Sequence, residues 1–443
     1  MEEVSPNAFY DSDDRPDPPK CHPNTRVAVI NKITDWATGI IETDAFMLWL
    51  YGPAGAGKTA IARKVAERFA EHGLLLASFL FFRSDPKRNT MKPLVANIAY
   101  RIASVIPATH KLIDAAMETD PLILSYSFEV QLAKLVLEPL RLLAGQGYFI
   151  NQQYPLLVVI DGLDECLDTG AQINFLQCLS SSVAQYPLPL KFLIVSRPEA
   201  HIKLAVALVG ERSTVSHLEL NDDFLPDEDI RRFLTDKFHD IKTCHPFCSG
   251  IPPFWPSKQQ IDTLIRKASG QFIYASLAIR FINSTFESPI RQLDIVLELR
   301  PPINHDLPFA ELDTLYTYIL SCTKDSTLVL HILGVYDVVK HLVLGVVRHL
   351  SQHTVNIVEF ALGLEDGDVC IYLGPLSSLL KVQEQEILFH HSSFMDFLLS
   401  PKRSKTFHVN PQLSHSLVAQ RILEVFPSIG VFPQSSVDSV SLE

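Results

Sequence analysis

Residues 47–59 read Met47-Leu48-Trp49-Leu50-Tyr51-Gly52-Pro53-Ala54-Gly55-Ala56-Gly57-Lys58-Thr59. The first five form an apolar run, which is typical of a strand buried on both faces of a parallel sheet. The last eight match the phosphate-loop pattern G-x-x-x-x-G-K-[ST] at every fixed position. Beyond the loop, Ile61, Val65 and Phe69 recur at every fourth residue, which predicts a helix. A strand, a glycine-rich turn and a helix in this order predict a site for a nucleoside triphosphate.

The residue types of the loop explain how it would hold phosphates. Its three glycines allow the backbone to wrap with N–H groups inward, and the N-terminus of the following helix adds positive potential. Lys58 is expected to reach the β- and γ-phosphates, and the Thr59 hydroxyl is expected to ligate Mg²⁺. The predicted nucleotide-binding residues are the loop and the position after it: Gly52, Pro53, Ala54, Gly55, Ala56, Gly57, Lys58, Thr59 and Ala60.

A second apolar run ends in three acids within five residues: Leu156-Leu157-Val158-Val159-Ile160-Asp161-Gly162-Leu163-Asp164-Glu165. In phosphate-loop enzymes the first acid at such a strand end orients the Mg²⁺ shell, and a later acid positions the attacking water. Asp161 is therefore the predicted metal residue, together with Thr59. Glu165 is the predicted water-activating base, and Asp164 is the alternative.

Two arginines follow predicted strands and are expected near the same edge of the sheet. Arg197 stands in Ser196-Arg197-Pro198 after an apolar run, and Arg83 follows a predicted strand over 77–82. Ligands of open parallel sheets lie off the carboxyl ends of the strands. Arg197 is therefore predicted to sense or neutralise the γ-phosphate. For both arginines the alternative is an exposed charge in a loop.

Strands separated by helical stretches up to about residue 220 predict an α/β fold with a parallel, doubly wound sheet. Beyond that point the pattern is mostly helical, with a predicted hairpin over 379–389. The expected organisation is a flexible acidic lead over 1–25, a phosphate-loop NTPase core over 26–220, a helical domain over 221–304, a winged-helix-like domain over 305–410 and a poorly structured tail over 411–443.

Together these motifs resemble a NACHT-type NTPase of the STAND class, in the form common among fungal NLR-like proteins and the nephrocystin-3-like N-terminal domain family. The phosphate loop and the box Asp161-Gly162-Leu163-Asp164-Glu165 carry most of the resemblance. Ser196-Arg197-Pro198 is similar to the family's sensor segment. Further along, 270–275, 312–316 and 389–398 resemble motifs of its helical and winged-helix regions.

The resemblance implies further contacts with the nucleotide. The segment 20–26 resembles the family's lead, whose Thr25 and Arg26 would lie near the base and ribose. By the same analogy, His391 would contact the nucleotide in a closed, diphosphate-bound form. Two departures stand out: Gln271 replaces a proline that related switches place against the base, and no ankyrin or WD40 repeats follow the winged-helix region.

Composition limits the classes of protein that fit. Apolar residues make up 47% and charged residues 20%, so the chain can bury a sizeable core. A net charge of −12 disfavours a binder of nucleic acid that relies on a basic surface. Seven irregularly spaced cysteines favour a reducing compartment, and the acidic N-terminus is unlike a signal peptide. The predicted location is cytoplasmic, with no membrane span.

Two other features suggest sites that the sequence does not complete. Cys244, His245 and Cys248, with His239 nearby, invite a zinc interpretation, but no second ligand pair follows at finger spacing. A winged helix invites a DNA interpretation, but residues 305–410 contain seven Lys and Arg against twelve Asp and Glu. That net charge has the wrong sign for phosphate contacts, so no DNA partner is expected.

The predicted function is a signalling switch that binds ATP with Mg²⁺ and hydrolyses it slowly to ADP and phosphate. Nucleotide state would control conformation and self-association, as in NLR-like innate immunity or heterokaryon incompatibility, with a signalling partner that the sequence does not name. The alternatives are a turnover ATPase, a phosphotransferase or a GTPase. GTP remains possible, although Thr323-Lys324-Asp325 lacks the spacer of a guanine-reading motif and lies far from the core.

Overall fold

The computed structural model describes residues 4–12, 20–42, 44–83, 85–185, 188–210, 215–285, 287–300, 309–346, 354–383 and 385–425. The chain divides into two compact units. The first comprises Met1–Asp240 and Phe254–Ala275, and the second comprises Ile241–Pro253 and Ser276–Glu443. The chain passes from one unit to the other three times: within α9 (Pro226–Cys244), between Pro253 and Phe254, and within α11 (Phe272–Ile282).

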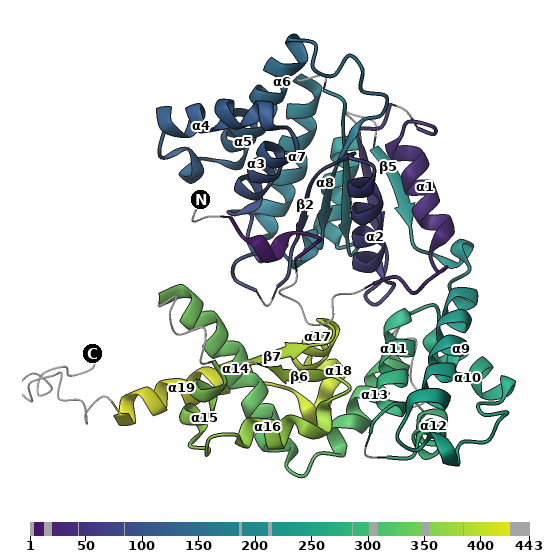
Figure 1. Ribbon diagram of the computed structural model, residues 1–443. Coiled ribbons are helices and arrows are strands. Elements are labelled where there is room, and N and C mark those ends of the chain that lie inside the picture. The colour runs from purple at the N-terminus through teal and green to yellow at the C-terminus, as the bar shows by residue number, and fades with distance from the viewer. Residues whose placement is uncertain are drawn as a thin grey trace, which may run out of the picture. The chain divides into compact units, whose positions relative to one another are not determined.

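A five-stranded parallel sheet organises the first unit, with the strand order β2-β3-β4-β1-β5 (Figure 1). Each predicted strand is present within a few residues of its expected bounds. The doubly wound parallel sheet is therefore confirmed. The strands are β1 (Met47–Tyr51), β2 (Leu75–Leu80), β3 (Leu156–Asp161), β4 (Leu190–Ser196) and β5 (Val215–Glu219).

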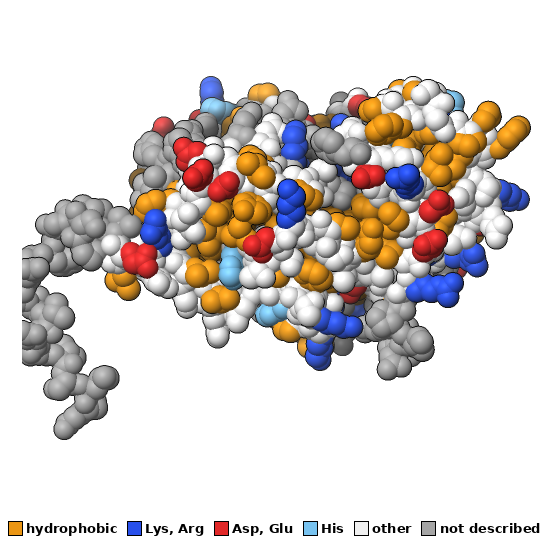
Figure 2. Space-filling view, turned by 90° about the horizontal axis from the view of Figure 1, so that it is seen from below, with side chains coloured by type: hydrophobic (Ala, Val, Ile, Leu, Met, Phe, Trp, Pro, Cys, Tyr) orange, Lys and Arg blue, Asp and Glu red, His pale blue; other side chains and the backbone are white. Residues whose placement is uncertain are grey.

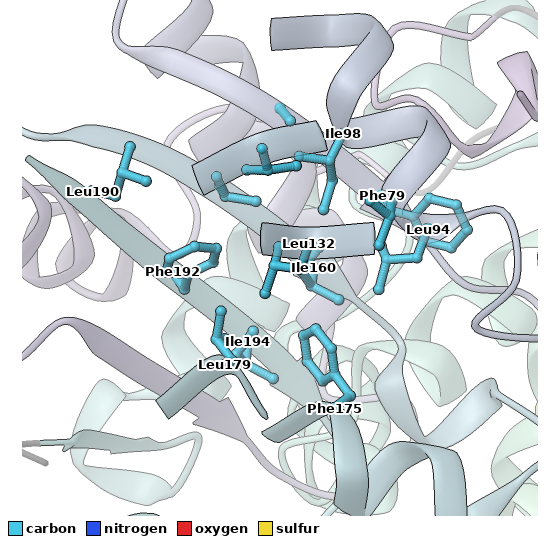
Figure 3. Packing of buried hydrophobic residues seen from close by; sticks show 14 of the residues in the cluster. Phe79, Leu94, Ile98, Leu132, Ile160, Phe175, Leu179, Leu190, Phe192 and Ile194 are labelled. Atoms are coloured by element: carbon cyan, nitrogen blue, oxygen red, sulfur yellow. The ribbon is translucent and has the colours of Figure 1, made fainter. Parts of the chain in front are cut away.

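Helices cover both faces of the sheet because successive strand residues point to opposite sides. Leu48 and Leu50 pack in one core with α1 (Val27–Ala37) and α2 (Lys58–Glu71). Met47 and Trp49 pack in the other core, with α3 (Leu94–Val105), α7 (Thr169–Gln185) and α8 (Ala200–Gly210). Figure 3 shows part of this second core, where strand residues such as Phe79 and Ile160 lie among helical ones such as Ile98 and Phe175. Burial on both faces explains why the central strands are continuously apolar.

The helix predicted over 132–143 is observed in three pieces. A π-helical turn (Ala133–Leu137) joins α5 (Phe128–Leu132) to α6 (Glu138–Gly145). Pro139 stands at the start of α6 and lacks an N–H group, so the regular α-helical ladder cannot continue through it. The other helices and short turns described in this unit are η1 (Pro6–Ala8), η2 (Pro107–Thr109), α4 (His110–Thr119), η3 (Ile123–Ser125), η5 (Leu163–Glu165), η6 (Asp222–Phe224) and α10 (Lys258–Ala268).

The expectation of a flexible lead over 1–25 is wrong for residues 4–12 and 20–25, which are packed on the first unit. Ala8 is completely buried, and the Tyr10 N–H donates to Ser78 Oγ on β2 at 3.1 Å. Because β2 is an edge strand, it needs a cover that a composition rich in Pro and Asp does not reveal. Residues 1–3 and 13–19 lie outside the described part of the chain.

The second unit is mainly helical and contains one antiparallel hairpin (Figure 1). The hairpin pairs β6 (Leu380–Gln383) with β7 (Glu386–Phe389), which confirms the one predicted over 379–389. The remaining elements described here are η7 (Cys248–Gly250), α12 (Pro289–Glu298), α13 (Ala310–Ser321), α14 (Ser326–Val346), α15 (Thr354–Leu362), α16 (Asp368–Leu373), η9 (Gly374–Leu376), α17 (Ser393–Leu398), α18 (Pro401–Ser404), η10 (Lys405–Phe407) and α19 (Pro411–Val425).

The expectation of a poorly structured tail from residue 411 is wrong for residues 411–425, which form α19. This helix packs closely against α14, where a Cβ built on Gly334 would lie 2.2 Å from Ser414 Oγ. Glycine at position 334 permits a close approach between two segments eighty residues apart. The local sequence pattern does not predict this contact. Residues 426–443 lie outside the described part of the chain.

Surface charge and helix length bear on possible partners. On the face in Figure 2, Lys and Arg side chains stand among Asp and Glu side chains and hydrophobic ones. In the described part of the chain, no helix combines the length and the apolar character that crossing a bilayer requires.

Candidate functional site

The glycine-rich loop joins β1 to α2 at the carboxyl edge of the sheet. Gly55 and Gly57 have φ values of +77° and +86°, where residues with a side chain are strained, so glycine is required at both. Helix α2 begins at Lys58, and the residue before it provides no side-chain cap. The first-turn N–H groups of an uncapped helix suit an anion supplied by a ligand. Local geometry therefore agrees with a phosphate-binding loop.

Lys58 is held by its own loop. Its Nζ donates to the carbonyl oxygens of Gly52 at 2.9 Å and Pro53 at 2.8 Å. Burial lowers the pKa of Lys58 to about 8, and the charges of Asp164, Asp161 and Glu165 oppose that change. A lysine in this position can donate to a phosphate oxygen, whose negative charge would favour the ammonium form.

The acids after β3 lie at the same edge. Asp161 is the last residue of β3 and is 2% exposed, and its carbonyl accepts a hydrogen bond from Phe81 N–H at 2.8 Å. Gly162 then turns the chain with φ +72°, and a Cβ there would lie 3.2 Å from the Phe81 carbonyl oxygen. This turn returns Asp164 and Glu165 toward the loop, so that both influence Lys58 electrostatically.

Strand β4 lies between β1 and β3, so its end projects between the phosphate loop and Asp161. Trp49 Nε1 on β1 donates to Ser196 Oγ at 2.9 Å and fixes the end of β4. The next residue is Arg197. Its backbone N–H donates to Asp164 Oδ1 at 2.9 Å, and its Nε lies 3.2 Å from Asp164 Oδ2. The predicted sensor and one predicted acid are therefore brought together as an ion pair.

Glu165 has a different environment from that of its neighbour Asp164. Its Oε2 accepts a hydrogen bond from the Arg83 backbone N–H at 3.1 Å, and the Arg83 guanidinium donates to the Asp164 carbonyl oxygen at 3.0 Å. Burial, reinforced by the negative charge of Asp164, raises the pKa of Glu165 to about 7. A carboxylate with this proton affinity is suited to general-base catalysis near neutral pH. The structure thus brings Arg83, which the sequence placed only at the sheet edge, into the site.

Thr25 and Arg26 are buried, and Arg26 lies beside the phosphate loop. Arg26 Nη2 donates to the Ala56 carbonyl oxygen at 2.9 Å, and its guanidinium lies 4.8 Å from the centre of the Phe272 ring. The Arg26 N–H donates to Asp229 Oδ2 in the first turn of α9 at 2.9 Å. Arg26 therefore joins the loop to the starts of two helices, and sequence reasoning gave no sign of its pairing with Asp229.

Helix α11 begins directly on the phosphate loop. The Ile273 N–H donates to the Gly55 carbonyl oxygen at 3.3 Å, and a Cβ built on Gly55 would lie 2.1 Å from Ile273 Cγ2. Any side chain at position 55 would collide with the helix. The residues around 270–275 were singled out by resemblance, but their contact with Gly55 follows only from the fold.

The other candidate residues lie in the second unit. His391 Nδ1 accepts a hydrogen bond from the Ser393 N–H at 3.0 Å and lies 2.9 Å from Ser393 Oγ, which is 2.9 Å from the Tyr316 hydroxyl. His245 is 3% exposed, its Nδ1 accepts from Phe247 N–H, and its Nε2 lies 3.0 Å from the Ser284 carbonyl oxygen. These contacts use both ring nitrogens of His245. Among the described residues, no group of three His, Cys, Asp or Glu side chains is arranged to hold a metal ion.

A magnesium ion bound with a nucleotide would meet oxygen donors of this chain. The Thr59 hydroxyl lies in the first turn of α2, and the Asp161 carboxylate ends β3. Hydroxyl and carboxylate oxygens are the hard ligands that Mg²⁺ prefers, and Mg²⁺ usually takes only one or two protein ligands together with phosphate oxygens and waters. The donor set therefore fits this ion.

The sheet order, the loop and the acidic end of β3 define the fold of a phosphate-loop NTPase. Residues 29–197 match the family model described as Nephrocystin 3, N-terminal. The match confirms the resemblance to the nephrocystin-3-like family over that segment, which contains the loop, Asp161, Glu165 and Arg197. No curated protein matches the chain.

Several solved structures are similar to this chain. The Walker-type ATPase paby2304 of Pyrococcus abyssi is 12% identical, with 85% of this chain and 97% of that chain covered and a TM-score of 0.41. Cdc6p from Pyrobaculum aerophilum is 12% identical, with 92% and 97% covered and a TM-score of 0.34. The Orc1 protein of Aeropyrum pernix, solved in complex with DNA, is 13% identical, with 90% and 94% covered and a TM-score of 0.35.

The raised pKa of Glu165 predicts how stability changes with pH in the absence of nucleotide and Mg²⁺. The folded state holds the Glu165 proton up to about pH 7, against an ordinary value of 4.5. The stability that this group contributes is therefore complete below pH 4.5 and is lost as pH rises to about 7. Because Glu165→Gln remains neutral, we expect it to raise the free energy of unfolding at pH 8 by about 1–3 kcal/mol more than at pH 4.5.

Urea denaturation of both proteins at the two pH values measures this difference. Glu118→Gln, an exposed position on α4, is the control and should show the same effect at both pH values. An equal effect of Glu165→Gln at both pH values would show that the folded state does not retain the proton.

Proposed function

We propose that this chain is a nucleotide-gated switch, which binds ATP with Mg²⁺ at residues 52–60 and hydrolyses it slowly. The observation that carries the proposal is the gathering of Lys58, Asp161, Glu165 and Arg197 at one edge of the sheet, where the last three act electrostatically on the first. This set matches the parts that phosphoryl transfer to water requires: a phosphate cradle, a metal residue, a base and a cation for the developing charge.

Within this proposal each charged residue has a role. Lys58 binds the β- and γ-phosphates, and Thr59 and Asp161 hold the Mg²⁺ that neutralises phosphate charge when bound. Glu165 orients and deprotonates the attacking water. Asp164 is the less suitable base because its carboxylate already accepts the Arg197 N–H and pairs with the Arg197 guanidinium. A γ-phosphate would compete with Asp164 for Arg197, so nucleotide state would change this ion pair.

The phosphate loop contacts residues of helices and segments outside the site. These contacts support a switch rather than an enzyme with frequent turnover. The loop carbonyls of Gly55 and Ala56 accept hydrogen bonds from Ile273 and Arg26, and α11 continues from the first unit into the second. A change in loop conformation on nucleotide binding would therefore act on a helix that both units share. Signalling through self-association or a protein partner is the consequence that we propose.

Lys58→Ala should remove triphosphate binding. Loss of a buried, charge-assisted donor leaves phosphate oxygens unpaired, and we expect affinity for ATP to fall by about 100-fold or more. Isothermal titration calorimetry with ATP and Mg²⁺ measures this change. Lys64→Ala is the matched control, because Lys64 lies on the same helix, half-exposed and paired with Glu67. Equal affinities of wild type and Lys58→Ala would overturn the assignment of the site.

Glu165→Gln should retain ATP binding and slow hydrolysis. A general base contributes about 100- to 10,000-fold to rate, so we expect kcat to fall by about 100-fold or more while Kd changes little. Phosphate release under saturating ATP measures kcat. Normal hydrolysis by Glu165→Gln, together with slow hydrolysis by Asp164→Asn, would transfer the base role to Asp164. A wild-type kcat of about 1–100 s⁻¹, the range of kinases, would favour a turnover enzyme.

Nucleotide state should control self-association. We expect the mass from size-exclusion chromatography with light scattering to rise from monomer to at least dimer with a non-hydrolysable triphosphate and Mg²⁺, and to remain monomeric with ADP. Lys58→Ala should stay monomeric in both. The same mass for wild type in all nucleotide states would contradict the switch while leaving nucleotide binding intact.

A further inference from the structure

The loop between β2 and α3 holds both acids that follow β3. Arg83 in this loop donates its N–H to Glu165 Oε2 and its guanidinium to the Asp164 carbonyl oxygen, at 3.1 and 3.0 Å. The hydrogen bond to Glu165 comes from the backbone N–H of Arg83, so it does not depend on the side chain at position 83. The orientation of Glu165 therefore depends on where the backbone of this loop lies.

Hydrogen bonds within the loop determine that position. Asn89 Nδ2 donates to the Arg83 carbonyl oxygen at 3.2 Å, and the Phe82 N–H donates to the Arg88 carbonyl oxygen at 3.1 Å. The Asn89 carbonyl accepts the Leu167 N–H at 2.8 Å, which ties the end of the loop to the segment just after Glu165. Residues 82 and 83 are thus hydrogen-bonded to residues 88 and 89 beside the acids.

Arg88 lies in this loop and is only 4% exposed. Its Nε donates to Asp85 Oδ2 at 2.7 Å, and its guanidinium lies 5.1 Å from the centre of the Phe82 ring. Its Nη1 donates to the Asn7 carbonyl oxygen at 2.8 Å. A buried arginine is stable only where its charge is paired and its donors are satisfied, so these contacts hold Phe82, Asp85 and Asn7 in place around Arg88.

The segment 4–12 lies outside the β2–α3 loop and forms hydrogen bonds with it. Asn7 Nδ2 donates to Asp85 Oδ2 at 2.7 Å, and Ser5 Oγ donates to the Lys87 carbonyl oxygen at 2.5 Å. Asn7 therefore contacts both members of the Arg88–Asp85 pair, one through its carbonyl and the other through its side chain. Without this segment the buried guanidinium would lose one of its acceptors.

We propose that Arg88, held by Asp85 and Asn7, is a positioning residue for hydrolysis, which keeps the Arg83 N–H on the Glu165 carboxylate. This inference rests on the proposed hydrolysis at Glu165. It extends the site to Asn7 in the 4–12 segment, which would affect the rate of hydrolysis through Arg88 and Asp85 without contact with the nucleotide.

The test compares two arginines that hold the same segment. Arg88→Met removes the ion pair with Asp85 and the bond to Asn7 but retains an apolar side chain of similar length. Arg101→Met is the matched control: Arg101 pairs with Asp11 at 2.9 Å and lies over the Phe9 ring at 4.5 Å, and neither partner belongs to the β2–α3 loop. Both variants are first shown to be folded by circular dichroism, and Kd and kcat for ATP are then measured.

We expect Arg88→Met to lower kcat about 10-fold, since small displacements of a catalytic group cost up to 100-fold, while Kd stays within about 2-fold. Arg101→Met should keep kcat within about 2-fold of wild type. In a Glu165→Gln background, Arg88→Met should cause no further loss, because both changes disable the same group. Arg88→Lys, which retains one donor to Asp85, should restore part of the rate. If Arg88→Met does not fold, Asn7→Ala replaces it, with an expected loss of about 3-fold.

The outcomes separate this inference from the function on which it rests. A wild-type chain that hydrolyses no ATP would contradict both. Hydrolysis that depends on Glu165, but is unchanged in Arg88→Met or Asn7→Ala, would overturn the positioning role alone. Equal losses in Arg88→Met and Arg101→Met, or additive losses with Glu165→Gln, would show that Arg88 acts only through general stability and would equally overturn it.

Discussion

Parallel strands that are neighbours in a sheet end at the same edge, and the whole site depends on this constraint. Strands β1, β4 and β3 are consecutive in the sheet, so the glycine-rich loop, Arg197 and Asp161 must meet there. The hydrogen bond between Trp49 and Ser196 fixes the ends of β1 and β4 relative to each other. Three segments separated by more than thirty residues each thus supply one charged group to a single small volume.

Two adjacent carboxylates in that volume have different partners. Asp164 is paired with the Arg197 guanidinium and also accepts its N–H, whereas Glu165 accepts one backbone N–H and has a pKa raised by burial. Neighbouring acids whose environments differ in this way can serve different roles, one as a structural partner of a cation and one as a base. This asymmetry is the basis for assigning the water-activating role to Glu165.

Segments from distant parts of the chain pack against the phosphate loop and against the β2–α3 loop. Arg26 connects the loop to Asp229 and Phe272, Ile273 packs on Gly55, and the 4–12 segment supports the loop that holds Glu165. Each contact uses a backbone carbonyl or a buried charge, which tolerates little displacement. Through the contacts of Arg26 and Ile273, a change in the conformation of the phosphate loop would reach α9 and α11.

Local sequence determined the strand, the glycine-rich loop and the helix that follows it, because a glycine pattern and a periodic apolar face are properties of adjacent residues. It also identified Asp161, Glu165 and Arg197 as strand-end residues. The tertiary structure decided which of these charges meet, since the order β2-β3-β4-β1-β5 is not written in any single segment. It also decided the positions of Arg83, Arg88 and the 4–12 segment, and the helix after residue 410. Their positions depend on the edge strand β2 and on close approaches such as that at Gly334, which arise only when distant segments pack together.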